Sequence, residues 1–428
     1  MLRFNDKNET LNAEEYNAIL VGLQLREDIS ESMEELAGLA DAAGVNVLGQ
    51  MIQALERPNT ATLIGKGKVE ELAELCESME ADTVIFDSEL TGAQIRNLEE
   101  ATGVRVIDRT ILILDIFASR ATSREGKLQV ELAQLQYRLP RLTGFGKSLS
   151  RLGGGIGTRG PGEKKLETDR RHIERRMDDI KAELLKAKKT RNLHRAGREK
   201  SAVPVVALMG YTNSGKSAIM NRLLAISDKE DKQVFEENML FATLDTAHRE
   251  ISLPNGDRFI LIDTVGFVSK LPHGLVEAFK STLEEVAYAD LLLHVVDSSY
   301  EDRDFQIKVT DRVINEIGAG GKPKLMVYNK IDLVSDIPVG TGGDSVCISA
   351  RTGENIDELV GMIKNKIFGS RVEVVMLIPY DRGDITSYLC ENARISDIKY
   401  ENDGTLLTGT FERKDYSKYR EYVREEAE

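Results

Sequence analysis

Apolar residues in the first part of the chain fall into short runs separated by stretches of helical spacing. The short runs predict strands at 18–25, 45–48, 62–64, 83–86 and 104–107. The stretches between them predict helices at 32–43, 69–79 and 92–101. Because strands that alternate with helices favour a parallel sheet, residues 1–115 are predicted to form an α/β domain. Within it, Gly65-Lys66-Gly67-Lys68 is either a structural turn, which we favour, or a fragment of an anion-binding loop.

The next segment, residues 116–200, shows helical spacing without strand patterns. Apolar positions at 128–139 and again at 166–184 predict two helices, the second of them long. Between them, residues 151–162 hold six glycines and a proline, so regular structure is not expected there. We therefore predict an antiparallel helical hairpin with a glycine-rich loop at its tip. A plain linker between domains is the alternative.

Beyond residue 200, uninterrupted apolar runs predict buried strands at 203–209, 259–262, 291–296, 325–328 and 346–348. Such runs are typical of a mostly parallel sheet with helices on both faces, which we predict for residues 201–369. The last segment, 370–428, predicts strands at 372–378, 395–400 and 406–411 and a helix at 385–392. It is expected to form a small α+β domain whose acidic end, 424–428, frays.

The run at 203–209 leads into a sequence that fits the phosphate-loop pattern G-x-x-x-x-G-K-[ST]. A helical stretch follows at 218–225, so loop N–H groups and the helix N-terminus would surround phosphates. We predict that Lys216 contacts the β- and γ-phosphates and that the Ser217 hydroxyl binds Mg²⁺. The predicted phosphate-binding residues are Gly210, Tyr211, Thr212, Asn213, Ser214, Gly215, Lys216 and Ser217.

Two further segments would complete a phosphate and metal site. The run at 259–262 ends in Asp263-Thr264-Val265-Gly266, which predicts a carboxylate near the metal and the Gly266 N–H near a γ-phosphate. Thr243 is the candidate for a second metal-binding hydroxyl, unless it is an ordinary strand threonine. It lies in a predicted switch segment made of Phe241, Ala242, Thr243, Leu244 and Asp245. The predicted catalytic residues are Lys216, Thr243 and Gly266.

The next motif indicates which base is bound. The strand at 325–328 runs into Asn329-Lys330-Ile331-Asp332, and the Asp332 carboxylate can accept from N1–H and the exocyclic amine of guanine. Adenine lacks both donors and would leave that carboxylate unpaired, at a cost of about 1–3 kcal/mol. The short segment Ser349-Ala350-Arg351 fits a loop whose backbone N–H meets guanine O6. Together these motifs predict a GTPase domain that binds GTP or GDP with Mg²⁺.

The residue after Gly266 bears on catalysis. Ras-like enzymes place a glutamine there to orient the attacking water, whereas this chain has Phe267, which cannot hydrogen-bond water. We therefore expect slow intrinsic hydrolysis and a site that a partner completes.

Composition narrows the setting of this GTPase. The 428 residues include no apolar run of membrane-spanning length, and the N-terminus lacks the apolar core of a signal peptide. The three cysteines, Cys76, Cys347 and Cys390, fit no metal spacing, and His294 is expected in the core. These features favour a reduced, cytoplasmic protein without a membrane segment. We expect a monomer, although no pattern in the chain determines the oligomeric state.

The net charge of −14 argues against nucleic acid, but its distribution does not. Residues 132–162 contain no acidic residue and five basic ones, among them Arg151 and Arg159 in the glycine-rich loop. Such asymmetry is typical of a phosphate-contacting surface, so these two arginines are candidate RNA contacts. Residues 181–200 carry eight Lys and Arg against two Glu, and there we favour a solvated helix face.

Several of these segments resemble the HflX GTPases. The resemblance rests on the phosphate loop 210–217, the switch at 241–245, Asp263-Thr264-Val265-Gly266-Phe267 and, most specifically, the glycine-rich stretch 151–163. It covers nearly the whole chain. It implies a ribosome-associated GTPase that binds the large ribosomal subunit and its rRNA and can split stalled or stress-arrested ribosomes. It also implies that the hairpin approaches the peptidyl-transferase region and that the ribosome stimulates hydrolysis.

Two departures and several alternatives remain. The family usually has Asp-Pro-Thr where this chain has Asp245-Thr246-Ala247, and it usually has threonine where this chain has Ala218. Neither departure removes a predicted phosphate or metal ligand, but the way the switch segment becomes ordered can differ from that of the family. A ribosome-assembly GTPase and a GTP-sensing scaffold are alternative functions, and a nucleotide kinase is disfavoured by the guanine motif. The expected location is the cytoplasm, in part on ribosomes or membranes.

Overall fold

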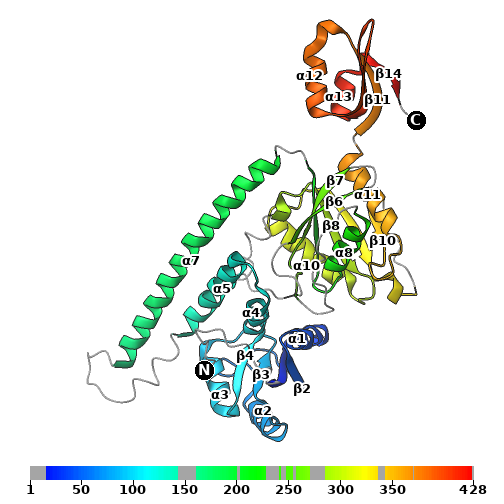
Figure 1. Ribbon diagram of the computed structural model, residues 1–428. Helices are drawn as coiled ribbons and strands as arrows, with labels where there is room; N and C mark the ends of the chain where they lie inside the picture. The colour runs from blue at the N-terminus through cyan, green and yellow to red at the C-terminus, as the bar shows by residue number, and fades with distance from the viewer. Residues whose placement is uncertain are drawn as a thin grey trace.

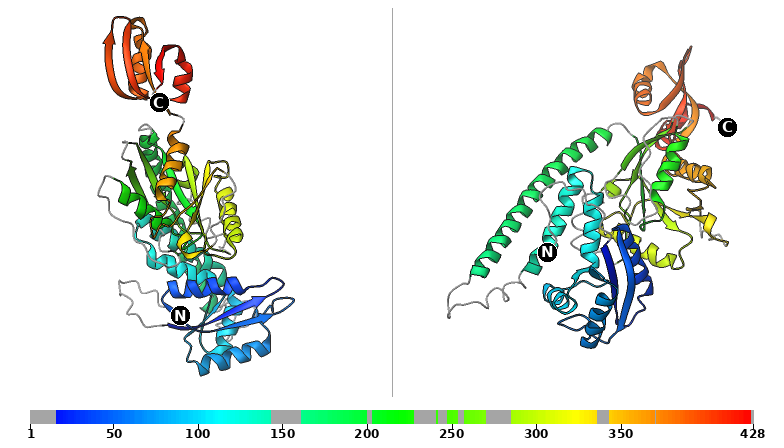
Figure 2. Two further views of the ribbon diagram at one scale, coloured as in Figure 1. Left: turned by 90° about the vertical axis from the view of Figure 1, so that its right-hand side faces the viewer. Right: turned by 60° about the horizontal axis from the view of Figure 1, so that its bottom comes forward.

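The computed structural model describes residues 16–142, 161–199, 203–227, 241, 247–253, 257–269, 285–335, 343–369 and 371–426. These residues include three sheets with their covering helices and a pair of long helices, and the second sheet lies between the first and the third (Figure 1). Two further views show the same order (Figure 2). In the described part of the chain, no helix combines the length and apolar character needed to cross a bilayer.

The first sheet is parallel throughout, in the order β2-β1-β3-β4. Alternation along β1 sends Ala18 and Leu20 to one face and Ile19 and Val21 to the other, and each face has its own apolar core. Its elements are β1 (Tyr16–Gln24), α1 (Ser30–Ala42), β2 (Val45–Ala54), α2 (Lys66–Ser78), β3 (Thr83–Phe86), α3 (Gly92–Thr102), β4 (Arg105–Asp108) and α4 (Arg109–Arg120).

Two local predictions in this region were wrong, and one helix was missed. Residues 62–64 are not a strand, because Asn59 accepts from the Ala61 and Thr62 N–H groups and closes a turn. Residues 66–68 are the first turn of α2 rather than a separate turn, with Lys68 paired to Glu71 at 2.8 Å. Helix α4 was not predicted, and it runs across residue 115, where we placed the end of the first domain.

The two long helices, α5 (Arg124–Leu142) and α7 (Pro161–Glu199), lie side by side, as the hairpin prediction requires (Figure 1). Leu128, Leu132, Met177 and Ile180 form the apolar seam between them. Pro161 and Gly162, which we expected in the irregular loop, belong to α7, because proline is well suited to the first turn of a helix. The rest of the loop, with Arg151 and Arg159, lies outside the described residues.

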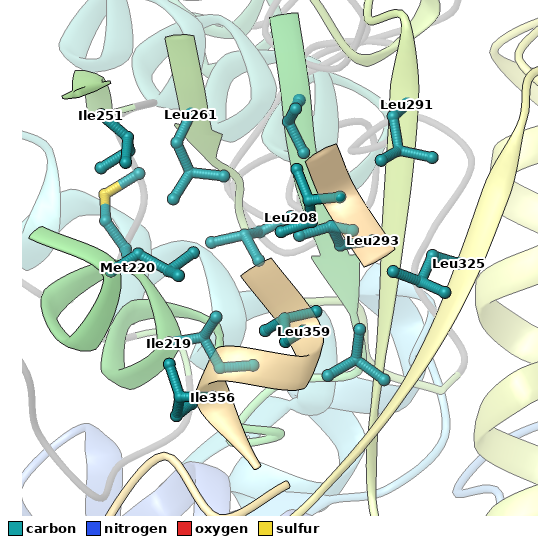
Figure 3. Close-up of a cluster of buried hydrophobic side chains, with 14 of the residues drawn as sticks. Leu208, Ile219, Met220, Ile251, Leu261, Leu291, Leu293, Leu325, Ile356 and Leu359 are labelled. Atoms are coloured by element: carbon teal, nitrogen blue, oxygen red, sulfur yellow. The ribbon is translucent and has the colours of Figure 1, made fainter. Parts of the chain in front are cut away.

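The second sheet has the order β10-β9-β8-β5-β7-β6 and is parallel except for β6. Figure 3 shows the apolar core on one of its faces, where Leu208 and Leu293 of the central strands meet Ile219 and Leu359 of the covering helices. His294 is buried in β8, as predicted. The elements are β5 (Val205–Gly210), α8 (Lys216–Ile226), β6 (Ala247–Ser252), β7 (Arg258–Asp263), β8 (Leu291–Asp297), α10 (Arg303–Glu316), β9 (Lys324–Asn329), η1 (Ile331–Leu333), β10 (Ser345–Cys347) and α11 (Ile356–Phe368).

The third sheet is antiparallel, in the order β12-β13-β11-β14, with helices packed on it. The acidic end was expected to fray, but β14 pairs with β11 from Val374 to Met376. Backbone hydrogen bonds hold such an edge strand, so its side chains need no apolar pattern. The elements are β11 (Arg371–Ile378), η2 (Tyr380–Arg382), α12 (Gly383–Asn392), β12 (Arg394–Glu401), β13 (Gly404–Glu412), α13 (Arg413–Lys418), η3 (Arg420–Tyr422) and β14 (Val423–Glu426).

Candidate functional site

The phosphate loop, residues 210–217, follows the central strand β5 and leads directly into α8. Lys216 is buried, and its ammonium group donates to the carbonyl oxygens of Gly210 at 3.2 Å and Tyr211 at 2.7 Å. Burial lowers the pKa of Lys216 to about 8, although Asp263 acts in the opposite direction. Among the described residues, no carboxylate lies within ion-pair distance of Lys216. A buried ammonium with only carbonyl partners is a site that an anion would stabilise.

Two glycines, one in the phosphate loop and one in the segment after β7, lie where the surrounding backbone leaves no room for a side chain. Gly215 has φ +92°, and a Cβ there would lie 2.1 Å from Asn329 Nδ2. A Cβ on Gly266 would lie 2.6 Å from Thr212 Cα and 3.0 Å from Lys216 Nζ. The phosphate loop, the Gly266 segment and the Asn329 segment therefore meet at backbone distance.

The metal side of the site consists of oxygen donors. Ser217 Oγ donates to Asp263 Oδ2 at 2.6 Å, and Asp263 is fully buried at the end of β7. A hydroxyl beside a carboxylate fits Mg²⁺, which takes oxygen ligands and completes its shell with water and substrate phosphates. No cluster of three or more His, Cys, Asp or Glu side chains able to hold a metal occurs in the described part of the chain.

The base side is organised by Asn329, at the end of β9. Its Nδ2 donates to Ser214 O at 2.9 Å, and its Oδ1 accepts from the Ala350 N–H at 3.0 Å. Asp332 is exposed and accepts from Ser349 Oγ at 2.6 Å, so its carboxylate is held at the surface of the site. Asn329 thus joins the phosphate loop to residues 349–353, which we call the base loop.

Phe267 occupies the place where Ras-like enzymes have a glutamine, and its side chain is buried among Met209, Ile262 and Ile314. Its backbone N–H donates to Gly210 O at 3.2 Å, and its carbonyl accepts from the Thr212 N–H at 2.7 Å. The side chain at this position therefore serves the apolar core rather than a water molecule.

The described structure brings together most of the predicted site residues. Thr264, Val265 and Ile331 are buried behind the site, and Phe241 is buried beside the phosphate loop, where its N–H donates to Thr212 Oγ1 at 2.9 Å. Lys330 has φ +65° and pairs with Asp297 at 2.7 Å. The predicted residues outside the described part of the chain are Ala242, Thr243, Leu244 and Asp245, together with Arg151 and Arg159.

An unpredicted polar cluster joins the first sheet to the phosphate loop, and we call it the domain junction: Glu35, Asp87, Arg109, Tyr211 and Ser269. Arg109 pairs with Asp87 at 2.9 Å and with Glu35, and it donates to Ser269 Oγ at 3.1 Å. The Tyr211 hydroxyl donates to Glu35 and accepts from the Ser269 N–H at 2.7 Å. Burial and then Glu35 raise the pKa of Tyr211, so its hydroxyl stays protonated.

Apolar contacts surround the domain junction. Phe117 of α4 packs edge-on against Phe241, with ring centroids 4.6 Å apart, and Val265 and Val268 join the same core as α1 and α4. A sequence signal for the junction is Arg109, a basic residue in the largely apolar stretch 106–117, but Asp108 and Asp115 of the same stretch are charged as well. A buried arginine needs carboxylate partners, but their positions are not evident from the sequence.

A phosphate loop at the carboxyl end of the central strand β5, a serine–aspartate pair beside it and an N-K-x-D segment at the end of β9 define a phosphate-loop GTPase. Comparison with known proteins gives the family. Four family models match in succession: "GTP-binding GTPase N-terminal" over 30–118, "GTP-binding GTPase Middle Region" over 120–198, "50S ribosome-binding GTPase" over 205–330 and "HflX C-terminal domain" over 339–414.

Known proteins are similar to this one along almost the full chain. GTPase HflX of Caldanaerobacter subterraneus subsp. tengcongensis is 50% identical over 399 residues, covering 93% of this chain and 92% of the relative. GTPase HflX of Escherichia coli (strain K12) is 40% identical over 396 residues, covering 91% and 92%. The chain therefore belongs to the HflX family of GTPases, and it binds and hydrolyses GTP. A GDP-bound GTP-binding protein from Sulfolobus solfataricus is a looser match, at 26% identity, 83% and 99% coverage and a TM-score of 0.44, and carries no weight in the assignment.

Proposed function

We propose that this GTPase binds the large ribosomal subunit in its GTP state and splits or rescues stalled ribosomes under stress. Membership of the HflX family supports this proposal, as does the match of residues 205–330 to a family described as a 50S ribosome-binding GTPase. The observation that carries the nucleotide part is Lys216, a buried ammonium whose hydrogen-bond partners among the described residues are two carbonyl oxygens.

The chemistry assigned to the site follows from its donors and acceptors. Lys216 and the N–H groups of the phosphate loop bind and orient the phosphates, and Ser217 and Asp263 would hold Mg²⁺. Mg²⁺ would neutralise charge that develops on the phosphate oxygens. Asp332 binds the guanine N1–H and amine, and Gly266 offers its N–H to the γ-phosphate. Thr243 is proposed as the second metal-binding hydroxyl.

The hydrolysis step is proposed to depend on the ribosome. Phe267 leaves the usual water-orienting position without a hydrogen-bonding side chain, so the free protein hydrolyses GTP slowly. The hairpin of α5 and α7 is proposed to bring the basic loop, with Arg151 and Arg159, to rRNA. Arginines beside glycines allow close contact with a phosphate backbone.

Two measurements test this proposal. GTP hydrolysis is measured with and without large subunits, with Lys216→Ala as the blank, and stimulation by the subunit is expected. Stalled ribosomes are then sedimented with GTP and the protein, and free subunits are expected. Stimulated hydrolysis without release of subunits would instead favour a ribosome-assembly role, and no stimulation would contradict ribosome action altogether.

The contribution of the loop is tested by its salt dependence. Arg151→Ala with Arg159→Ala is expected to weaken subunit binding and to reduce its dependence on salt, because two phosphate contacts are lost. Arg170→Ala with Arg171→Ala is the matched control, since these α7 arginines pair with Glu174 and Glu167 at 2.9 Å. Equal effects of the two double variants would contradict a specific role for the loop.

A further inference from the structure

Arg222 connects the helix that starts at the phosphate-binding lysine to the base loop. It lies in α8, six residues after Lys216, and its Nε donates to Ala350 O at 3.0 Å. Its Nη2 donates to Arg351 O at 2.6 Å. A guanidinium can hold two neighbouring carbonyls at once because its donors form a rigid fork.

One of the two carbonyls that the fork holds belongs to the peptide unit between Ala350 and Arg351. No cis peptide occurs in the described residues, so the N–H of each unit points away from the C=O of the same unit. When Arg222 holds the Ala350 carbonyl, the Arg351 N–H therefore points away from the Arg222 Nε. Within the described part of the chain, the Arg351 N–H has no acceptor, whereas the Ala350 N–H is already bonded to Asn329.

Other contacts leave the base loop dependent on Arg222. Ser349 Oγ donates to Asp332, and the Thr352 and Gly353 N–H groups bond back to Ser349, so these contacts stay within the base side. The half-buried guanidinium also lies against Gly353, where a Cβ would stand 3.5 Å from its Cζ. Within the described part of the chain, Asn329 and Arg222 are thus the two side chains that join this loop to the elements of the phosphate site.

We propose that Arg222 is a positioning residue for guanine selection. It orients the Ala350–Arg351 peptide so that an N–H donor faces O6 of the base. Guanine has an acceptor at that position, whereas adenine has an amine, which would meet another donor. Arg222 therefore contributes to discrimination at position 6 of the base, and Asp332 to recognition at positions 1 and 2. This inference rests on the proposed roles of Asp332 and the base loop.

Binding of GDP, IDP and ADP distinguishes the contribution of Arg222 from that of Asp332. IDP keeps O6 but lacks the 2-amine, and ADP has neither O6 nor the 2-amine. For Arg222→Ala, we expect GDP and IDP affinities to fall roughly tenfold and ADP affinity to stay the same, which is about the effect of one charge-assisted hydrogen bond. The preference for GDP over ADP, measured as the ratio of the two affinities, then falls roughly tenfold, and the preference for GDP over IDP is unchanged. Arg222→Lys keeps the charge but not the forked donors, and its GDP and IDP affinities are expected to fall roughly threefold.

The control is Arg312→Ala, which removes an exposed arginine from α10 and is expected to leave all three affinities unchanged. A uniform loss for GDP, IDP and ADP in Arg222→Ala would show a merely structural role and overturn the inference, as would no loss at all. Should Arg222→Ala fail to fold, Arg222→Lys gives the same comparison. Asp332→Ala tests the underlying assignment separately, because it must narrow the GDP-to-IDP ratio if Asp332 binds the 2-amine.

Discussion

Both parallel sheets of this molecule place a buried cation beyond the carboxyl ends of their strands, but the two cations have opposite surroundings. Arg109 follows β4 and pairs with Glu35 and Asp87. Lys216 follows β5 and contacts two carbonyl oxygens. Burial alone would lower the pKa of both groups. The carboxylates raise the pKa of Arg109 above its usual value, whereas that of Lys216 falls to about 8.

The difference shows how one architecture serves two purposes. In open parallel sheets, ligands bind outside the carboxyl ends of the strands, where the chain changes direction across the sheet. In the first sheet this position is filled by the domain junction, because Tyr211 and Ser269 of the GTPase region contact Glu35 there. In the second sheet the corresponding position is lined by Lys216, Ser217 and Asp263. Arg109, which has carboxylate partners, holds the two regions together, whereas Lys216, which has no ion pair among the described residues, is suited to bind an anionic ligand.

The largest effect is expected at Lys216. Lys216→Ala should reduce GTP turnover on the ribosome by about 100-fold or more, since it removes a preorganised charge from the transferred phosphate. The stability of the nucleotide-free protein should hold or rise, because a desolvated ammonium is lost. Turnover assays and urea unfolding measure the two quantities, with the exposed Lys308→Ala as control. A marked loss of stability would show that Lys216 is a structural cation like Arg109.

The next effect is expected at Arg109. Arg109→Met removes the cation that neutralises Glu35 and Asp87 at the domain junction and should cost about 3–5 kcal/mol of stability. The midpoint of urea unfolding measures it, with Arg312→Met as the exposed control. Adding Glu35→Gln to Arg109→Met should restore part of the loss. If the single variant were as stable as the control, the ion pairs of the domain junction would contribute nothing.

The pKa of Lys216 predicts a pH dependence of binding. Below about pH 8 the lysine is protonated with or without nucleotide, and above it the nucleotide-free protein has lost the proton. Bound phosphates raise the pKa again, so binding takes up a proton and GDP affinity should fall up to tenfold per pH unit above about 8. By the same linkage, the stability of the nucleotide-free protein should rise between about pH 8 and pH 10.5, where only the unfolded chain keeps the proton.

Calorimetry in two buffers of different ionisation enthalpy measures the proton uptake directly. Lys216→Arg is the control, since a guanidinium does not titrate in this range and guanine ionises equally with both proteins. Uptake that persists in Lys216→Arg would assign it to another group. No uptake in either protein would mean that Lys216 stays charged before the nucleotide binds.

The smallest effect is expected at Tyr211, which belongs to both regions. Tyr211→Phe removes the hydroxyl that contacts Glu35 and Ser269 and should cost about 1 kcal/mol of stability. GDP affinity should stay within a factor of about two, because the atoms of this loop that we propose to bind phosphate are backbone N–H groups and Lys216. Fluorescence titration with GDP measures it, with Tyr288→Phe, an exposed tyrosine, as control. A tenfold change would show that the domain junction and the nucleotide site act as one unit.

Most of the GTPase fold was predictable from the sequence because its signals are local. Strands β5, β7, β8 and β9 are near-continuous apolar runs, and each motif begins where a run ends. The parallel sheets and the paired long helices were predicted correctly for the same reason. The predictions were wrong where hydrogen bonds to the backbone, rather than apolar side chains, set the local structure. Residues 62–64 form a turn around Asn59, and β14 is an acidic edge strand that pairs with β11.

The sequence by itself determined which chemistry this protein carries, the binding and hydrolysis of GTP, since the motifs of a GTPase stand in short segments with characteristic spacing. Only the tertiary structure decided which groups the charged side chains contact. Arg109 and Ser269 are 160 positions apart, Arg222 and Ala350 are 128 apart, and neither pair has a spacing that could reveal it. A binding motif depends on local backbone geometry, whereas a buried ion pair or a positioning contact depends on which surfaces of the folded chain meet.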